Sequence, residues 1–217
     1  MRQFFLQTVD EPSFLILSEV PCGTPSRDAL RAIVEPDPED EDIQETYLLE
    51  RVQVDAIMQL CKIQLDLGQH QFQLASWDEC DGLPYRLHAG RELPLMLSGA
   101  KPLSYLYGTI PPNEHFVEIP EYLFDPYVDI GRFVKRQRSL FREGWAMGMR
   151  QVLYALKEEA WRIDAFFLVQ DTAHKTGWNE ALTRMEGTLL GYEEWQNDAF
   201  IGRMKGSDRS EQETASP

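Results

Sequence analysis

The chain has 217 residues, with 36 acidic and 21 basic side chains and a formal net charge of -15. Hydrophobic residues make up 43% of it, which is enough for a packed core and excludes a wholly disordered chain. The excess of acid argues against general binding of nucleic acid or of anionic membranes, because both depend on Lys and Arg. No apolar run approaches the ~20 residues of a membrane-spanning helix. We therefore expect a soluble, cytoplasmic protein.

The first part of the chain predicts a hairpin, a helix and a charged loop. Residues 3–8 and 13–20 are rich in aromatic and branched side chains around a short polar turn, which predicts two paired strands. Residues 25–34 predict a helix, with Thr24 as the capping residue. Residues 35–45 hold seven acids and no base, and two prolines near the start preclude a regular helix there. This acidic loop should be exposed to solvent.

The middle of the chain predicts several short strands. Residues 46–67 are ambiguous, because their composition favours a helix while the alternation of apolar residues favours strands. We interpret them as extended structure with a break near Cys61. Further strands are predicted at residues 70–77, 83–90, 101–108 and 116–120.

The C-terminal half changes character, since helical signals dominate from residue 121 to 190. The clearest helix covers residues 178–190, with Gly191 placed to end it. Residues 160–169 fit either a helix or a buried strand. Residues 205–217 are small and polar and predict a disordered tail. The pattern favours one α+β domain over residues 1–204, a largely antiparallel sheet from the N-terminal half packed against helices from the C-terminal half.

One segment has the opposite charge to the rest of the chain. Residues 132–142, RFVKRQRSLFR, carry five positive charges and no negative one. On a helix, three of the bases would share one face at positions i, i+3 and i+7 beside an apolar stripe. We interpret this segment as an amphipathic surface helix balanced by the protein's own acids, with the acidic loop as a candidate partner. The alternative is a contact with phosphate or nucleic acid through Lys135, Arg136, Arg138 and Arg142.

Two further segments are candidate contacts for a protein partner. The acidic loop could present closely spaced carboxylates to a basic protein, through Glu39, Asp40, Glu41 and Asp42. Near the end of the predicted fold, aromatic residues are flanked by acids, which is typical of a binding rim. The residues of this rim are Tyr192, Glu194 and Trp195.

The three cysteines, Cys22, Cys61 and Cys80, match neither a zinc site nor a C-x-x-C redox pair. We expect them to pack as small hydrophobic residues in a reducing compartment. His115 lies near several glutamates in sequence, but neither a strand nor a helix would bring them together around a metal ion. No cofactor motif is present, and we expect no metal and no cofactor.

These observations favour a non-enzymatic binding protein, such as an adaptor, an inhibitor or an immunity-type factor, that engages a basic protein partner. The alternative from another class is a small enzyme with a dispersed active site in a cleft between sheet and helices. Its acid or base would then be Glu118, His115 or Asp164. The sequence leaves the oligomeric state open.

Overall fold

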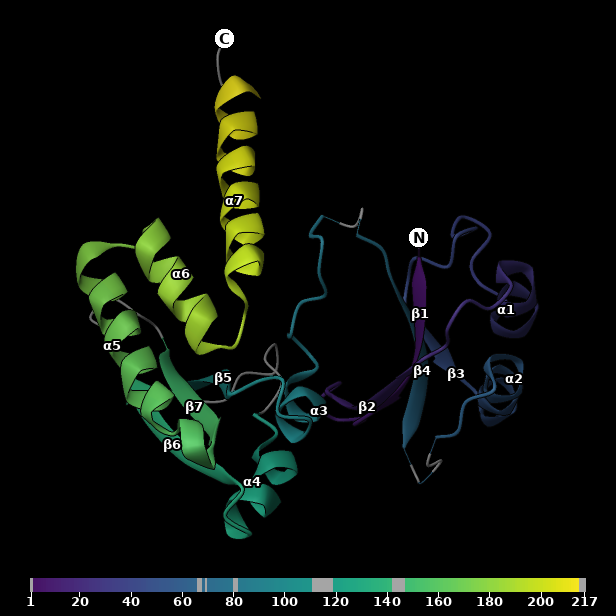
Figure 1. Cartoon of the computed structure of the whole chain (residues 1–217), viewed down its shortest axis with the longest axis horizontal. Coiled ribbons are helices and arrows are strands. Elements are labelled where there is room, and N and C mark those ends of the chain that lie inside the picture. The colour runs from purple at the N-terminus through teal and green to yellow at the C-terminus, as the bar shows by residue number, and fades with distance from the viewer. Residues whose placement is uncertain are drawn as a thin grey trace. The chain divides into compact units, whose positions relative to one another are not determined.

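The computed structural model describes residues 2–65, 68, 70–79, 82–110, 119–141 and 147–214, with side chains described up to residue 205. The chain forms two compact units, Met1–Pro94 and Leu95–Pro217, called here the N-terminal and C-terminal units. Each unit combines an antiparallel sheet with helices, which confirms the predicted α+β class (Figure 1). The described residues form two sheets where one was expected. The single domain over residues 1–204 stays a prediction.

The N-terminal unit is built on a four-stranded sheet with the order β2-β1-β4-β3, in which every pair of neighbours is antiparallel. Its strands are β1 Gln3–Val9, β2 Ile16–Pro21, β3 Tyr47–Leu49 and β4 Gln71–Trp77. The first two strands are the predicted hairpin, and β4 confirms the strand predicted at residues 70–77. Because side chains alternate along a strand, Phe4 and Leu6 of β1 share one face with Phe72 and Leu74 of β4.

Two helices, α1 (Arg27–Val34) and α2 (Arg51–Cys61), lie on that face of the sheet (Figure 1). The helix predicted at residues 25–34 is therefore confirmed, although its capping residue is Ser26, whose hydroxyl accepts the N–H of Ala29. The core between sheet and helices contains fully buried side chains from both helices, among them Leu30, Val54 and Ile57.

The interpretation of residues 46–67 as extended structure is wrong over most of their described length. Only the three residues of β3 are strand, and α2 follows directly. Val54 and Ile57 are buried at helical spacing, and the side chain of Gln53 accepts the N–H of Glu50 at 2.8 Å, which caps the helix. The strand predicted at residues 83–90 is also wrong, since this stretch is irregular and leads into a short helix, α3 (Glu92–Leu97).

The C-terminal unit is built on a three-stranded antiparallel sheet with the order β5-β7-β6. Its strands are β5 Leu103–Ile110, β6 Phe133–Leu140 and β7 Gly148–Leu156. The first of them confirms the strand predicted at residues 101–108, while most of the one predicted at 116–120 lies outside the described residues. The remaining elements are α4 Glu121–Asp129, a 3-10 turn at Lys157–Glu159, α5 Trp161–Thr176, α6 Glu180–Leu189 and α7 Glu194–Thr214.

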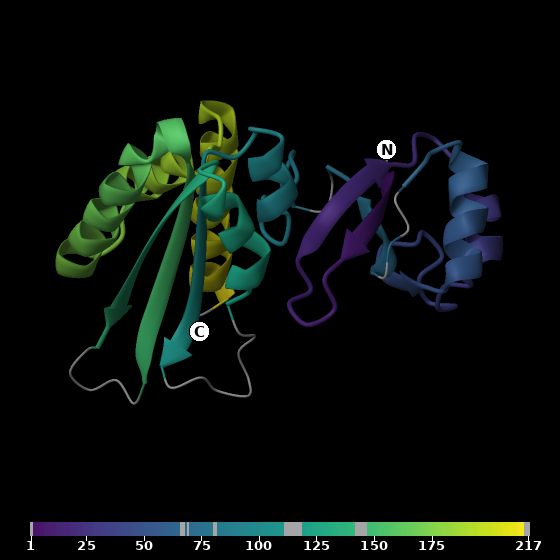
Figure 2. The same ribbon diagram turned by 90° about the horizontal axis from the view of Figure 1, so that it is seen from below.

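Helices cover both faces of this sheet, as Figure 2 shows. On one face, Leu153 and Ala155 of β7 share a core cluster with Phe166 of α5. Tyr154, which points to the opposite face, stacks on Phe124 of α4 with ring centroids 4.7 Å apart. The segment 160–169, left open between helix and strand, is helical from Trp161 onward.

The end of the chain partly follows the predictions. The predicted helix at residues 178–190 is confirmed as α6, which is followed by Gly191 at a φ of 93°. The backbone of α7 continues to Thr214, although the sequence predicted a disordered tail from residue 205. Helix α7 packs against α6 through its first turns, where Asn197 and Ile201 are buried.

The prediction of a basic helix at residues 132–142 is wrong, because most of this segment forms β6. Helix α4 ends at Asp129, and Gly131, with a φ of 71°, then turns the chain into the strand. Strand β6 then pairs with β7 from Phe133 opposite Leu156 to Leu140 opposite Met149. This pairing with the next strand overrides the helical spacing of the charges.

Candidate functional site

The basic side chains of β6 point alternately to the two faces of its sheet, and acids meet them on both. On the α4 face, the Nζ atom of Lys135 lies 2.5 Å from a carboxylate oxygen of Glu121 and 2.7 Å from one of Asp125. The hydroxyl of Tyr154 donates to the same Asp125 at 2.8 Å, and Arg150 also pairs with Glu121. Four ionic groups and a phenol therefore form one partly buried network.

This network shifts the pKa values of its members in consistent directions. Burial acts to raise the pKa of both carboxyls, but the hydrogen bonds from Lys135 and its neighbours outweigh it and leave the pKa of Glu121 and of Asp125 below their usual values. Burial likewise acts to lower the pKa of Lys135, and the two carboxylates reverse this and raise it. The charged forms are thus the stable ones, as expected for a structural ion-pair network.

On the opposite face, the bases of β6 meet acids of α5. Arg136 lies 3.0 Å from Asp164, and Arg138 lies 2.8 Å from Asp171. The guanidinium of Arg138 also sits 4.2 Å from the centre of the Phe167 ring. The acids that balance the basic segment are therefore on α4 and α5 of its own unit. Arg142, the fourth base of the proposed nucleic-acid contact, lies outside the described residues.

The acidic loop is organised by one of its own carboxylates. Asp40 is only 9% exposed and accepts the backbone N–H groups of Gln44 at 2.7 Å and Glu45 at 3.0 Å, and the hydroxyl of Tyr47 at 2.6 Å. Burial acts to raise the pKa of Asp40, but these hydrogen bonds outweigh it and lower the pKa below its usual value. The bond to Asp40 also raises the pKa of Tyr47 to about 12.

The other acids of the loop differ in what they can offer a partner. Asp42 pairs with Arg27 of α1, and the backbone carbonyl of Glu41 accepts a hydrogen bond from Arg31 at 2.6 Å. The side chains of Glu39 and Glu41 are exposed. Of the four acids predicted to contact a partner, Asp40 is thus buried in hydrogen bonds within the loop, Asp42 is paired with Arg27, and Glu39 and Glu41 have exposed side chains.

The predicted aromatic rim lies where α6 gives way to α7. Glu194 is the exposed first residue of α7, and the indole N–H of Trp195 donates to Glu193 at 3.0 Å. Tyr192 is half-buried, with the ammonium of Lys101 5.8 Å from its ring centre. These three residues are close in the chain and present one exposed indole.

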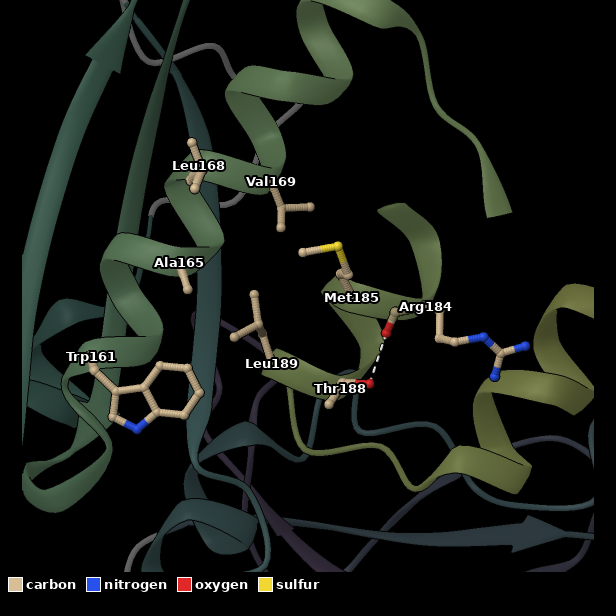
Figure 3. Close-up of a pocket in the computed structure, with 8 residues that line it drawn as sticks. All are labelled: Trp161, Ala165, Leu168, Val169, Arg184, Met185, Thr188 and Leu189. Atoms are coloured by element: carbon tan, nitrogen blue, oxygen red, sulfur yellow. Dashed lines mark hydrogen bonds between the residues drawn. The ribbon is translucent and has the colours of Figure 1, made fainter. Parts of the chain in front are cut away.

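A larger apolar feature lies between α5 and α6, in a groove with a volume of about 390 Å³. It is lined by Trp161, Ala165, Leu168, Val169, Arg184, Met185, Thr188 and Leu189, and we call it the α5–α6 groove. Figure 3 shows that the first four of these come from α5 and the others from α6.

The walls of the α5–α6 groove keep large apolar side chains in contact with water. Trp161 is 58% exposed, Leu168 67% and Met185 52%. On α5, Trp161, Ala165 and Leu168 follow one another at positions i, i+4 and i+7, which forms a continuous stripe along the helix. An apolar stripe with this spacing normally packs against a core, but here its large side chains are exposed to solvent.

The polar groups of the α5–α6 groove are already engaged elsewhere. The side chain of Arg184 turns towards α7, where it lies 2.6 Å from Asp198, and the hydroxyl of Thr188 donates to the carbonyl of Arg184 at 2.9 Å (Figure 3). None of the eight lining residues is an acid, a histidine, a cysteine or a serine. The groove therefore offers apolar contact and has no group that could act as a general base or a strong nucleophile.

Of the three candidate residues for the alternative active site, only Asp164 lies among the described residues. His115 and Glu118 lie outside them, and Asp164 is exposed and paired with Arg136. Sequence reasoning missed Glu186, whose carboxylate accepts from the amide of Gln170 at 2.6 Å. Burial raises the pKa of Glu186 and this hydrogen bond opposes the rise. Within the described ranges, no three His, Cys, Asp or Glu side chains form a group that could hold a metal ion.

No protein-family model, curated protein or solved structure matches this chain. In the part of the chain that the structure describes, every helix is too short or too polar to cross a lipid bilayer. The case for function therefore depends on the surfaces described above.

The sequence did contain a signal for the α5–α6 groove. Trp161, Ala165, Leu168 and Val169 have helical spacing, and so do Ala181, Met185 and Leu189 in the next helix. Such stripes usually predict buried faces. The sequence could not predict that the two stripes border one groove, nor that part of each stripe stays exposed.

Proposed function

We propose that this chain is a non-enzymatic binding protein whose α5–α6 groove takes an apolar face of a positively charged segment in a protein partner. One observation carries the proposal: three large apolar side chains, Trp161, Leu168 and Met185, are more than half exposed around a single groove. Contiguous exposed apolar surface of this kind is typical of interaction sites, and aromatic and Met side chains are enriched in the cores of interfaces.

The shape and composition of the groove favour a helical segment as its occupant. Two packed helices with apolar stripes form a channel into which the apolar face of a third helix can pack. The residues that such a helix would cover are Trp161, Leu168 and Met185, which supply large contact areas and few polar groups to desolvate. Burying one such side chain stabilises a complex by about 1.5–3 kcal/mol.

The charge of the chain favours a basic partner. A formal net charge of -15 speeds the approach of a positively charged segment and slows that of an acidic one. Long-range charge acts mainly on the association rate, whereas packing in the groove acts mainly on the dissociation rate. The two contributions can therefore be measured separately.

The first experiment uses the full chain and a synthetic amphipathic peptide of about five helical turns, with Leu on one face and Lys on the other. We expect saturable binding that Leu168→Asp weakens at least tenfold, roughly the loss of one buried Leu, through faster dissociation. A matched control is Val52→Asp on α2, where the native side chain is 69% exposed and the same charge is introduced. Calorimetry and surface plasmon resonance give the affinities and rates.

A peptide with Glu in place of Lys tests the electrostatic part. It should associate more slowly than the Lys peptide, and added salt should reduce this difference. Equal affinities of the Leu168→Asp and Val52→Asp proteins for the Lys peptide would contradict the proposal. In a lysate, the relevant partners are basic proteins retained by Val52→Asp and lost by Leu168→Asp.

A further inference from the structure

Two of the three cysteines meet inside the N-terminal unit. Cys22 directly follows β2, and its N–H donates to the carbonyl of Phe4 on β1 at 2.8 Å. Cys61 is the last residue of α2. Cys22 is a buried member of the cluster between sheet and helices, Cys61 is packed against the same cluster, and each thiol influences the pKa of the other. Both are free thiols.

From this juxtaposition we propose that Cys22 and Cys61 form an oxidisable dithiol, which a hydroperoxide converts into an intramolecular disulfide. The pair is independent of the α5–α6 groove, which belongs to the other unit. Spacing in the sequence gave no sign of it, because 38 residues separate the two cysteines and only the packing of α2 against the sheet brings them together.

The two thiols are unequal, which assigns them different roles. Cys22 is 3% exposed, and burial, with the neighbouring Cys61, raises its pKa to about 12. Cys61 is only half-buried; burial also raises its pKa, but the hydrogen bond from Cys22 opposes that rise. Cys61 is therefore the thiol that meets the oxidant, because it is the more accessible of the two.

The reaction has two balanced steps. The thiolate of Cys61 attacks the hydroperoxide, forms an S–O bond and breaks the O–O bond, which gives a sulfenic acid and releases an alkoxide that takes up the proton of the thiol. The sulfur of Cys22 then attacks the sulfenic sulfur, so that an S–S bond forms, the S–O bond breaks and water leaves. Two thiols are oxidised and one hydroperoxide is reduced to an alcohol and water.

The disulfide would close a loop that contains α1, the acidic loop, β3 and α2. A loop of about 40 residues gives an entropic stabilisation in the upper part of the range known for disulfides. Thiol reductants would reverse it. The bond would thus switch the stability of the N-terminal unit with the redox state of the surroundings.

The test treats the reduced full chain with hydrogen peroxide, blocks the remaining thiols with N-ethylmaleimide and maps the disulfides by mass spectrometry without reduction. We expect a Cys22–Cys61 linked peptide and a rise in Tm of about 5–15 °C, reversed by dithiothreitol. The half-buried site allows Cys61→Ser, which should lose both effects, as should Cys22→Ala. Cys80→Ser is the matched control and should behave as the wild type.

Three outcomes would overturn the proposal. They are a disulfide that involves Cys80, oxidation of Cys61 to the sulfinic acid without a link to Cys22, and full recovery of all thiols under conditions that oxidise free cysteine. A linked peptide whose formation leaves Tm unchanged would confirm the dithiol and remove its effect on stability.

Discussion

The acidic loop and the basic strand β6 carry opposite charge, and they differ in how their charged groups are met within their own units. The loop turns one carboxylate inward, where Asp40 binds the backbone and Tyr47, and it meets Arg27 and Arg31 of the adjacent helix. The strand distributes its bases over two faces, where acids of α4 and α5 meet them. A run of like charge in the sequence thus does not by itself mark a surface that awaits a partner.

The difference between the two segments is one of burial. The loop depends on a single buried acceptor that satisfies several donors, whereas the strand depends on ion pairs whose exposure ranges from low on the α4 face to high at Arg136. Buried hydrogen bonds to a charged group contribute much more than exposed ion pairs. Substitutions should therefore have unequal effects in the two segments.

The largest effect is expected at Asp40. Asp40→Ala removes the acceptor of three hydrogen bonds and should reduce the free energy of unfolding by about 2–3 kcal/mol. Glu39→Gln, next to it and exposed, should change this free energy by less than about 0.5 kcal/mol. Denaturation with urea measures both, and equal effects of the two variants would contradict the assigned role of Asp40.

Acid should remove the same contribution without a mutation. Because the pKa of Asp40 is lower in the folded chain than its usual value of 3.8, its contribution is complete above that value and is lost as the pH falls through the lowered pKa. The stability difference between the wild type and Asp40→Ala should therefore be constant at neutral pH and shrink in strong acid. A difference that does not change with pH would show that the carboxylate charge is irrelevant.

A smaller effect is expected on the α4 face of β6. Lys135→Met keeps the length of the side chain but leaves Glu121 and Asp125 with fewer donors, and we expect a loss of about 1–2 kcal/mol in the free energy of unfolding. Thermal and urea denaturation of the full chain provide the measurement.

The smallest effect is expected one residue further along the strand. Arg136 and Asp164 are 56% and 65% exposed, so that Arg136→Met should cost less than about 0.5 kcal/mol. A cost at Arg136 equal to that at Lys135 would mean that the two faces of the strand do not differ as described.

Local signals in the sequence were sufficient for some elements. The hairpin of β1 and β2, helix α1 and helix α6 depend on turn residues, caps and apolar spacing within a few residues of one another. Gly191 was correctly placed at the end of α6 because a positive φ favours glycine there.

Other elements depend on contacts with neighbouring strands and helices. Lys135 and Arg138 fit a helical face as well as they fit a strand, and only the pairing of β6 with β7 decides between them. In α2, apolar residues alternate and also recur with helical spacing, so that burial of Val54 and Ile57 against the sheet makes the choice. The contact between Cys22 and Cys61 and the exposure of the α5–α6 groove arise in the same way, from packing between elements.

The position of β6 in its sheet has one more consequence. Among the described strands, whose order is β5-β7-β6, this strand is an edge, and the edge of a sheet exposes backbone groups that another chain could pair with. Lys135, Arg136 and Arg138 place positive charge on both sides of that edge. A second copy of β6 would bring the same Lys and Arg side chains against them, and we expect this like charge to disfavour edge-to-edge pairing of two copies.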